Sequence, residues 1–179
     1  FTAIADAVSI PGILYNVPSR TALNMDSATT LRLADVPNIV GVKEASSDPD
    51  QIAYVIKDSP EGFRVWSGND NEILSTMAVG GYGIVSVAGN IISGQIQKMM
   101  GLLLEGDVEA AAAEHLRLLP IFNALFYITN PIPIRYAMNR SGFSVGPARL
   151  PMVPEPSELA AFSARFDPIM DQYAIDLAD

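Results

Sequence analysis

Cysteine is absent from this chain of 179 residues, and histidine occurs only once, as His115. Without cysteine there is no disulfide bond, no thiolate nucleophile and no cysteine-ligated metal. A single histidine cannot supply the several imidazoles of a multi-histidine metal site. His115 lies in the stretch EAAAAEHLRLL, whose alanine content predicts a helix. We therefore expect a packing or surface role for His115, and no metal site.

Positive charge is also scarce. The chain has 11 Lys and Arg residues against 20 Asp and Glu residues, a formal net charge of −9. Electrostatic binding of nucleic acid or of an anionic membrane needs clustered cations, which this sequence lacks, so we expect neither as a partner. No apolar run reaches the roughly 20 residues that span a bilayer, and no secretory signal pattern is visible. We expect a cytoplasmic protein.

The first residues, FTAIADAV, have neither an initiator methionine nor a helix N-cap. Their apolar members, Phe1, Ile4, Ala5 and Val8, keep helical spacing. The pattern is that of the later turns of a helix already under way. We therefore expect the chain to be a piece of a longer protein.

Four short apolar runs, separated by helical patterns, occupy the first part of the chain. They are GILYNV from residue 12, NIVGVK from 38, FRVWS from 63 and GIVSVAG from 83. Strands that alternate with helices favour a parallel sheet with crossover helices. After about residue 105 only helical patterns follow, apart from the proline-rich loop GPARLPMVPEP. The chain is therefore predicted to be an α/β protein with a helical region at its end.

Two architectures fit this pattern, an open doubly wound sheet and half of a (β/α)8 barrel. A dinucleotide-binding sheet would carry a glycine-rich phosphate loop after a strand, whereas GGYG at 80–83 precedes one. In a barrel, functional side chains gather at the carboxyl ends of the strands. Polar residues end each of these four runs, at 15–16, 43–44, 67–70 and 86. We therefore predict half of a barrel over residues 1–104 and a helical region over residues 105–179.

The run NIVGVK ends in Lys43, one of only three lysines in the chain. By strand alternation, the side chains expected to face the barrel interior include those of Ile13, Tyr15, Ile39, Gly41 and Val65. Lys43 would share the face of Gly41, and would meet Tyr15 at the rim of two adjacent strands. Gly41, which has no side chain, would leave space beneath the amine.

An amine in that place has two interpretations. A desolvated lysine loses its proton more easily and becomes a nucleophile for carbonyl carbons, and a nearby phenol can relay protons to the adduct. Alternatively, Lys43 is an ordinary strand-end lysine that pairs with Glu44 or Asp48 in water. Spacing alone does not choose between them.

A set of motifs in fixed order resembles the dihydrodipicolinate synthase family of pyruvate-dependent, Schiff-base aldolases. The motifs are YNVPSRT at 15–21, GVKEAS at 41–46, SGND at 67–70, GGYGIVSV at 80–87, NPIPIR at 130–135 and RLPMVP at 149–154. The resemblance covers essentially the whole chain and corresponds to the family's second half. It implies strands five to eight of a (β/α)8 barrel (a TIM barrel), followed by the C-terminal helical region.

The resemblance also implies roles for single residues. Lys43 would form the Schiff base with pyruvate, and Tyr15 would relay protons. Arg20 would hold the carboxylate of aspartate semialdehyde, a task suited to the bidentate geometry of a guanidinium. The rim positions near the substrates would be Gly68, Asn69 and Val85. Asn16, by contrast, we assign to fixing the turn before Pro18.

The reaction that the resemblance implies condenses pyruvate with L-aspartate 4-semialdehyde to 4-hydroxy-tetrahydrodipicolinate, in lysine and diaminopimelate biosynthesis. It needs no metal or organic cofactor, because the covalent imine on lysine does the chemistry. The resemblance further implies a homo-oligomer, a dimer or tetramer. The family's first half carries two carboxylate-binding threonines and a tyrosine from a partner subunit, which are outside this chain. We therefore expect it to need that other half for turnover.

Some positions depart from the family pattern. Ala22 stands where glycine is usual, Asn69 where aspartate is frequent, and Arg135 where lysine is usual. Two alternatives also stay open. One is another pyruvate-dependent lyase, acting on N-acetylneuraminate or a 2-keto-3-deoxy sugar acid, although those relatives generally lack the SRT of 19–21. The other is a half-barrel without catalytic activity.

Overall fold

The computed structural model describes residues 1–173, which fall into two compact units. The first unit runs from Phe1 to Ser86 and the second begins at Val87. This division comes before residue 104, where the expected barrel half was to end, and it groups the helix Gly89–Leu104 with the helices that follow. The two units are described separately.

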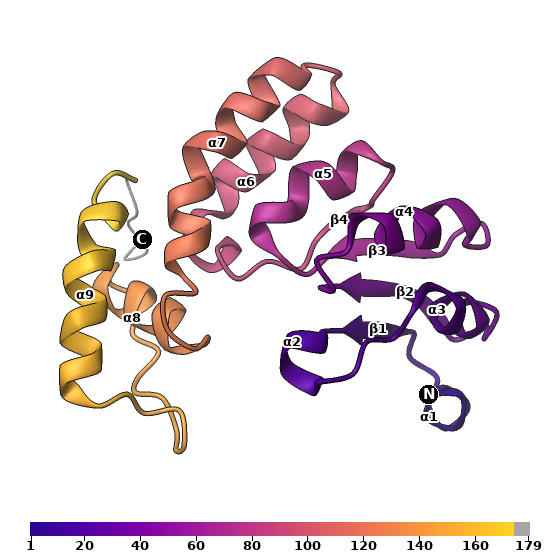
Figure 1. Cartoon of the computed structure of the whole chain (residues 1–179), viewed down its shortest axis with the longest axis horizontal. Helices are drawn as coiled ribbons and strands as arrows, with labels where there is room; N and C mark the ends of the chain where they lie inside the picture. Colours follow the sequence, from indigo (N-terminus) through magenta and orange to yellow (C-terminus); the bar gives the residue numbers. More distant parts are fainter. Residues whose placement is uncertain (174–179) are drawn as a thin grey trace. The chain divides into compact units, whose positions relative to one another are not determined.

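The first unit is an α/β structure with a parallel sheet, as the repeat of strands and helices predicts. Its strands pair in the order β1-β2-β3-β4, and each neighbouring pair is parallel (Figure 1). The elements in chain order are α1 Thr2–Asp6, β1 Gly12–Asn16, α2 Pro18–Thr21, α3 Ser27–Ala34, β2 Ile39–Glu44, α4 Pro49–Asp58, β3 Arg64–Ser67, η1 Asp70–Glu72, α5 Ile73–Ala78 and β4 Gly83–Ile84.

The helices α3 and α4 begin at aspartate caps. The Oδ1 atom of Asp26 accepts a hydrogen bond from the backbone N–H of Thr29 at 2.8 Å, and Oδ1 of Asp48 accepts one from Gln51 at 3.0 Å. Each bond satisfies a donor that the first turn of a helix leaves without a backbone partner. Hydrogen bonding by Thr29, first through its side chain and then through its backbone N–H, lowers the pKa of the Asp26 carboxyl. These caps set where each crossover helix starts after its strand.

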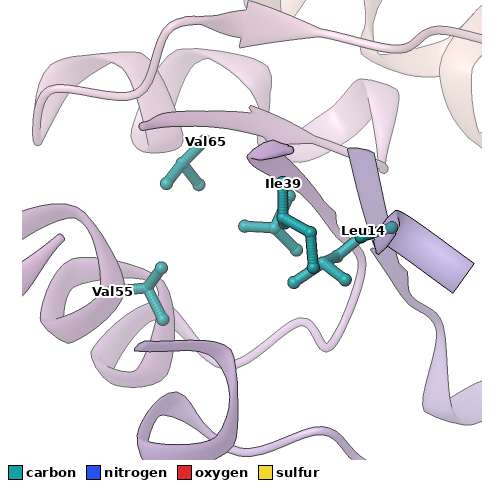
Figure 2. Close-up of a cluster of buried hydrophobic side chains, with 6 residues drawn as sticks. Leu14, Ile39, Val55 and Val65 are labelled. Carbon is teal, nitrogen blue, oxygen red and sulfur yellow. The ribbon is translucent and has the colours of Figure 1, made fainter. Parts of the chain in front are cut away.

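One face of the sheet packs against the helices. Leu14 lies opposite Val42, which lies opposite Val65, so all three project to the same side. They are buried together with Ile39 and with Val55 of α4, as Figure 2 shows. This cluster is the hydrophobic core of the first unit.

A register shift near the start of β2 changes the expected alternation. Gly12 lies opposite Ile39 but Ile13 lies opposite Gly41, so β2 has one more residue than β1 at this point. Such a bulge moves the residues before it to the other face of the sheet. Ile39 therefore packs in the helix-side core and not beside Gly41. The expectation that Ile39 and Val65 face the barrel interior is wrong, since both are in this core.

The space at Gly41 is filled by its neighbours. A β-carbon there would lie 2.3 Å from the backbone oxygen of Arg64 and 2.5 Å from Cζ3 of Trp66. The Trp66 ring in turn meets the ring of Tyr82 edge-on, with centroids 5.4 Å apart. The expectation of an open space beneath the amine is therefore wrong. Glycine at this position lets β3 and its tryptophan approach β2 closely.

The second unit consists of packed helices. They are α6 Gly89–Leu104, α7 Val108–Ala124, α8 Ile132–Arg140 and α9 Pro156–Met170. The rings of Phe162 and Phe166 stack with centroids 4.9 Å apart, and the ring of Tyr136 meets both edge-on. The Tyr136 hydroxyl donates to the carboxylate of Asp167, which joins α8 to α9. Burial and this bond raise the pKa of Tyr136.

His115 lies on α7 with its ring 6.1 Å from that of Phe122, as a packing residue would. Burial lowers the pKa of its imidazole. Within residues 1–173, no helix combines the length and the apolar character that a membrane crossing requires.

The close approach at Gly41 can be tested by adding one methyl group. Gly41→Ala should lower the free energy of unfolding by about 1–3 kcal/mol, because the new β-carbon would overlap with β3. Gly12→Ala is the control in the same sheet, since its β-carbon would meet only the Asn38 oxygen at 3.5 Å, an ordinary contact. Urea unfolding measures both variants. Equal stability of the two would contradict the packing described for Trp66.

Candidate active site

Tyr15 and Lys43 lie side by side at the carboxyl ends of β1 and β2. The two residues are directly opposite each other, and Trp66 of β3 is opposite Lys43 in turn. The Nζ atom of Lys43 is 4.3 Å from the centroid of the Tyr15 ring, within the range of a cation–π contact. The expected meeting of these two side chains is therefore confirmed, and it takes place on the sheet face opposite the core.

The lysine does not pair with the acidic residues near it in sequence. Among the ion pairs of residues 1–173, none includes Lys43. Glu44 is fully buried on the other face of the sheet, and Asp48 is occupied as the cap of α4. The interpretation of Lys43 as a strand-end lysine paired with Glu44 or Asp48 is therefore wrong.

Gly68 follows β3 and lies against the lysine side chain. A β-carbon at this position would be 3.2 Å from Cε of Lys43 and 2.7 Å from the β-carbon of Ala45. Its backbone N–H donates to the backbone oxygen of Glu44 at 2.6 Å, which continues the pairing of β3 with β2. The absence of a side chain at Gly68 thus leaves room for the stem of Lys43.

The side chain of Asn69 is held by Ser47 and Glu72. Its Nδ2 atom donates to Oγ of Ser47 at 3.2 Å and to Oε2 of Glu72 at 3.1 Å. The Ser67 hydroxyl donates to the Asn69 backbone oxygen at 2.9 Å. None of the hydrogen bonds of the described part of the chain joins Asn69 to Lys43. The structure therefore brings Gly68 to the lysine but leaves the Asn69 amide engaged elsewhere.

Val85 and Arg20 lie on separate segments of the first unit. Val85 comes just after the end of β4, and its backbone N–H donates to the backbone oxygen of Ser67 at 3.0 Å. Arg20 lies in the single-turn helix α2, which follows β1, and its side chain is exposed. Within residues 1–173 the guanidinium forms no hydrogen bond or ion pair, so it is available to a ligand. No hydrogen bond or ion pair joins Arg20 or Val85 to Lys43 within the described residues.

The structure adds one group that the sequence interpretation missed. Glu44 is fully buried, and its carboxylate accepts hydrogen bonds from the side chains of Asn16 and Gln51. Asn16 therefore does not serve the turn before Pro18, and that assignment is wrong. Alternation could have indicated this, because a residue next to Lys43 must point to the opposite face of the sheet. Among residues 1–173, no three His, Asp or Glu side chains gather into a metal-binding group.

Comparison with known proteins assigns the family. The model of the dihydrodipicolinate synthetase family matches residues 1–162. The chain belongs to this family. A relative named 4-hydroxy-tetrahydrodipicolinate synthase, from Symbiobacterium thermophilum, is 54% identical over 154 residues, which are 86% of this chain and 52% of the relative. A relative of the same name from Dehalococcoides mccartyi is 46% identical over 177 residues, which are 99% of this chain and 59% of the relative.

Solved structures of the dihydrodipicolinate synthetase family agree with the fold. A dihydrodipicolinate synthase from Aquifex aeolicus superposes with a TM-score of 0.91 at 33% identity, over 99% of this chain and 60% of that one. The dihydrodipicolinate synthase from Cyanidioschyzon merolae with lysine bound superposes with a TM-score of 0.89 at 38% identity. The match covers 94% of this chain and 57% of that one. The chain therefore spans between half and two thirds of the length of these relatives.

Proposed function

We propose that this chain carries the Schiff-base centre of a 4-hydroxy-tetrahydrodipicolinate synthase, a lyase that condenses pyruvate with L-aspartate 4-semialdehyde in lysine and diaminopimelate biosynthesis. The observation that carries the proposal is the unpaired amine of Lys43 beside the ring of Tyr15 at the carboxyl ends of adjacent parallel strands. The names of the relatives support it. They also favour this activity over cleavage of N-acetylneuraminate or sugar acids.

In the proposed reaction, the amine of Lys43 attacks the ketone carbon of pyruvate, and water leaves to give an imine. Loss of a methyl proton converts the imine into an enamine, whose carbon attacks the aldehyde of aspartate semialdehyde. The amino group of that substrate then closes the ring and releases Lys43. Tyr15 gives and takes protons in these steps, because its ring lies against the amine. The covalent imine replaces any metal or organic cofactor.

The remaining residues are assigned to substrate binding. Arg20 would bind the carboxylate of aspartate semialdehyde, which its exposed and unpaired guanidinium supports. Gly68 makes room for the lysine stem. Val85 would act through its backbone oxygen, because its N–H is bonded to the Ser67 backbone oxygen. Asn69 would lie at the rim near the substrates. Its amide nitrogen would not bind them, because it is bonded to Ser47 and Glu72.

We propose further that the parallel sheet forms strands five to eight of a (β/α)8 barrel. The strands β1 and β4 each have a partner on one side only in the described sheet. Ile13 and Tyr15 of β1 are about half exposed, at 50% and 49%, although barrel strands turn such residues inward. Residues 1–104 would supply this half and 105–179 the helical region. The other half, with its carboxylate-binding threonines, and association into a homo-oligomer would complete a cytoplasmic enzyme.

The covalent role of Lys43 can be tested on the chain itself. Pyruvate followed by borohydride should add one reduced pyruvyl group to the peptide that contains Lys43, because reduction traps the imine. Lys57, whose side chain is 71% exposed, and Lys98 on α6 serve as internal controls for non-specific labelling. Peptide mass spectrometry locates the adduct, which should vanish in Lys43→Ala. Equal labelling of the three lysines would contradict the proposal.

Turnover of Tyr15→Phe tests the proton relay. The measurement uses a reconstituted enzyme, defined here as this chain joined to the N-terminal half of the Symbiobacterium thermophilum relative. Phenylalanine keeps the ring against Lys43 and removes only the hydroxyl, so the fold should persist while kcat falls by roughly 100-fold. A coupled assay of product formation measures the rate. An unchanged kcat would show that the hydroxyl is not needed, and no activity in the unaltered reconstituted enzyme would count against the half-barrel.

The choice of second substrate depends on Arg20 in this proposal. Arg20→Ala in the reconstituted enzyme should raise KM for aspartate semialdehyde much more than KM for pyruvate, because only the former loses a carboxylate partner. Loss of one partner of a desolvated charge pair lowers the binding free energy by about 2–5 kcal/mol. Steady-state kinetics with each substrate varied in turn gives both constants. A rise in KM for pyruvate alone would reassign Arg20 to the other substrate.

A further inference from the structure

A polar network, buried at Asn16, Glu44 and Gln51, lies on the sheet face opposite Tyr15 and Lys43. Its members are Asn16, Asn24, Glu44 and Gln51, together with the backbone of Met25 and Ser46. Asn16 and Glu44 each follow a proposed catalytic residue in sequence, so alternation turns them to the helix side of the sheet. The network therefore begins one residue away from each reacting side chain.

The centre of the network is a buried carboxylate. Glu44 is 0% exposed, and among the ion pairs of residues 1–173 none includes it. Its Oε1 accepts from Asn16 Nδ2 at 2.9 Å and from the Ser46 backbone N–H at 2.8 Å. Its Oε2 accepts from Gln51 Nε2 at 3.2 Å. A buried carboxylate needs such donors, and a network that satisfies all its members holds them rigidly.

The same network closes the loop that carries Arg20. The Oδ1 atom of Asn16 accepts from the Met25 backbone N–H at 3.0 Å, and its Nδ2 donates to Asn24 Oδ1 at 2.8 Å. Gln51 also accepts from Asn24 Nδ2 at 2.8 Å and donates to the Met25 oxygen at 3.2 Å. The loop of residues 17–23, which contains α2, is thus anchored in the network at both ends, by Asn16 before it and by Asn24 after it.

We propose that Asn16, Glu44 and Gln51 are positioning residues that fix the Arg20 loop relative to Lys43. This inference rests on the proposed function, since it assigns to the network the spacing between the site of the imine and the carboxylate of the second substrate. The residues touch no substrate. They act by tying the end of β1, the end of β2 and both ends of the loop to the first turn of α4.

The test exchanges the two partners at the Glu44–Gln51 contact. Gln51→Glu puts two buried carboxylates against each other and should open the network. Adding Glu44→Gln restores one carboxylate and one amide at this contact in reversed order, and should close it again, with only the bonds from residue 51 to the Met25 oxygen and to Asn24 Oδ1 lost. Thr30→Val is the matched control, because Thr30 is 0% exposed in α3 and its hydroxyl has no partner among the described residues.

In the reconstituted enzyme, Gln51→Glu should raise KM for aspartate semialdehyde by about tenfold and leave KM for pyruvate within twofold. In the double variant and in Thr30→Val, both KM values should stay within twofold of those of the unaltered enzyme. On the chain alone, trypsin should cut after Arg20 about tenfold faster in Gln51→Glu, with cleavage after Lys98 of α6 as the reference. Equal rises in both KM values, or no rescue by the double variant, would overturn the positioning role.

Borohydride trapping at Lys43 separates this inference from the proposed function. Gln51→Glu should still form the pyruvyl adduct, because the amine and Tyr15 lie on the other face of the sheet. If the unaltered reconstituted enzyme is not trapped at Lys43, the proposed function fails. If it is trapped, and KM and trypsin cleavage are the same in every variant, the proposed function stands and the network has no positioning role.

Discussion

The register of β1 against β2 is the constraint on which the site depends. Because strand side chains alternate, the pairing that sets Leu14 opposite Val42 in the core also sets Tyr15 opposite Lys43 on the other face. A slip of one residue would carry the apolar set out of the core and the tyrosine and lysine into it. Burial of the helix-side residues therefore holds Tyr15 and Lys43 in place on the opposite face.

The helix-side face changes character along the strands. It is apolar through Leu14, Val42 and Val65, and it becomes polar at Asn16, Glu44 and Ser67, which are all buried. A buried carboxylate costs solvation energy unless N–H donors surround it. The end of β1, the loop after β2 and α4 supply those donors at Glu44, and in doing so they are tied together. The polar end of the sheet thus organises the loops that follow the strands.

Several features of this arrangement could be predicted from local sequence. The four parallel strands follow from apolar runs alternating with helical patterns. The meeting of Tyr15 with Lys43 follows from alternation in two adjacent strands. Other features could not be predicted this way. The bulge that moves Ile39 into the core depends on how β1 and β2 pair, and no residue near Ile39 signals it.

The sequence by itself determined the alternation of strands and helices, the family, and the face on which Lys43 and Tyr15 lie, because each depends on the order and spacing of neighbouring residues. Tertiary structure decided what fills the space around them. Trp66 occupies the room at Gly41, and Glu44 takes partners from β1 and α4. These contacts join residues far apart in the chain, and close packing selects them only when the elements have come together.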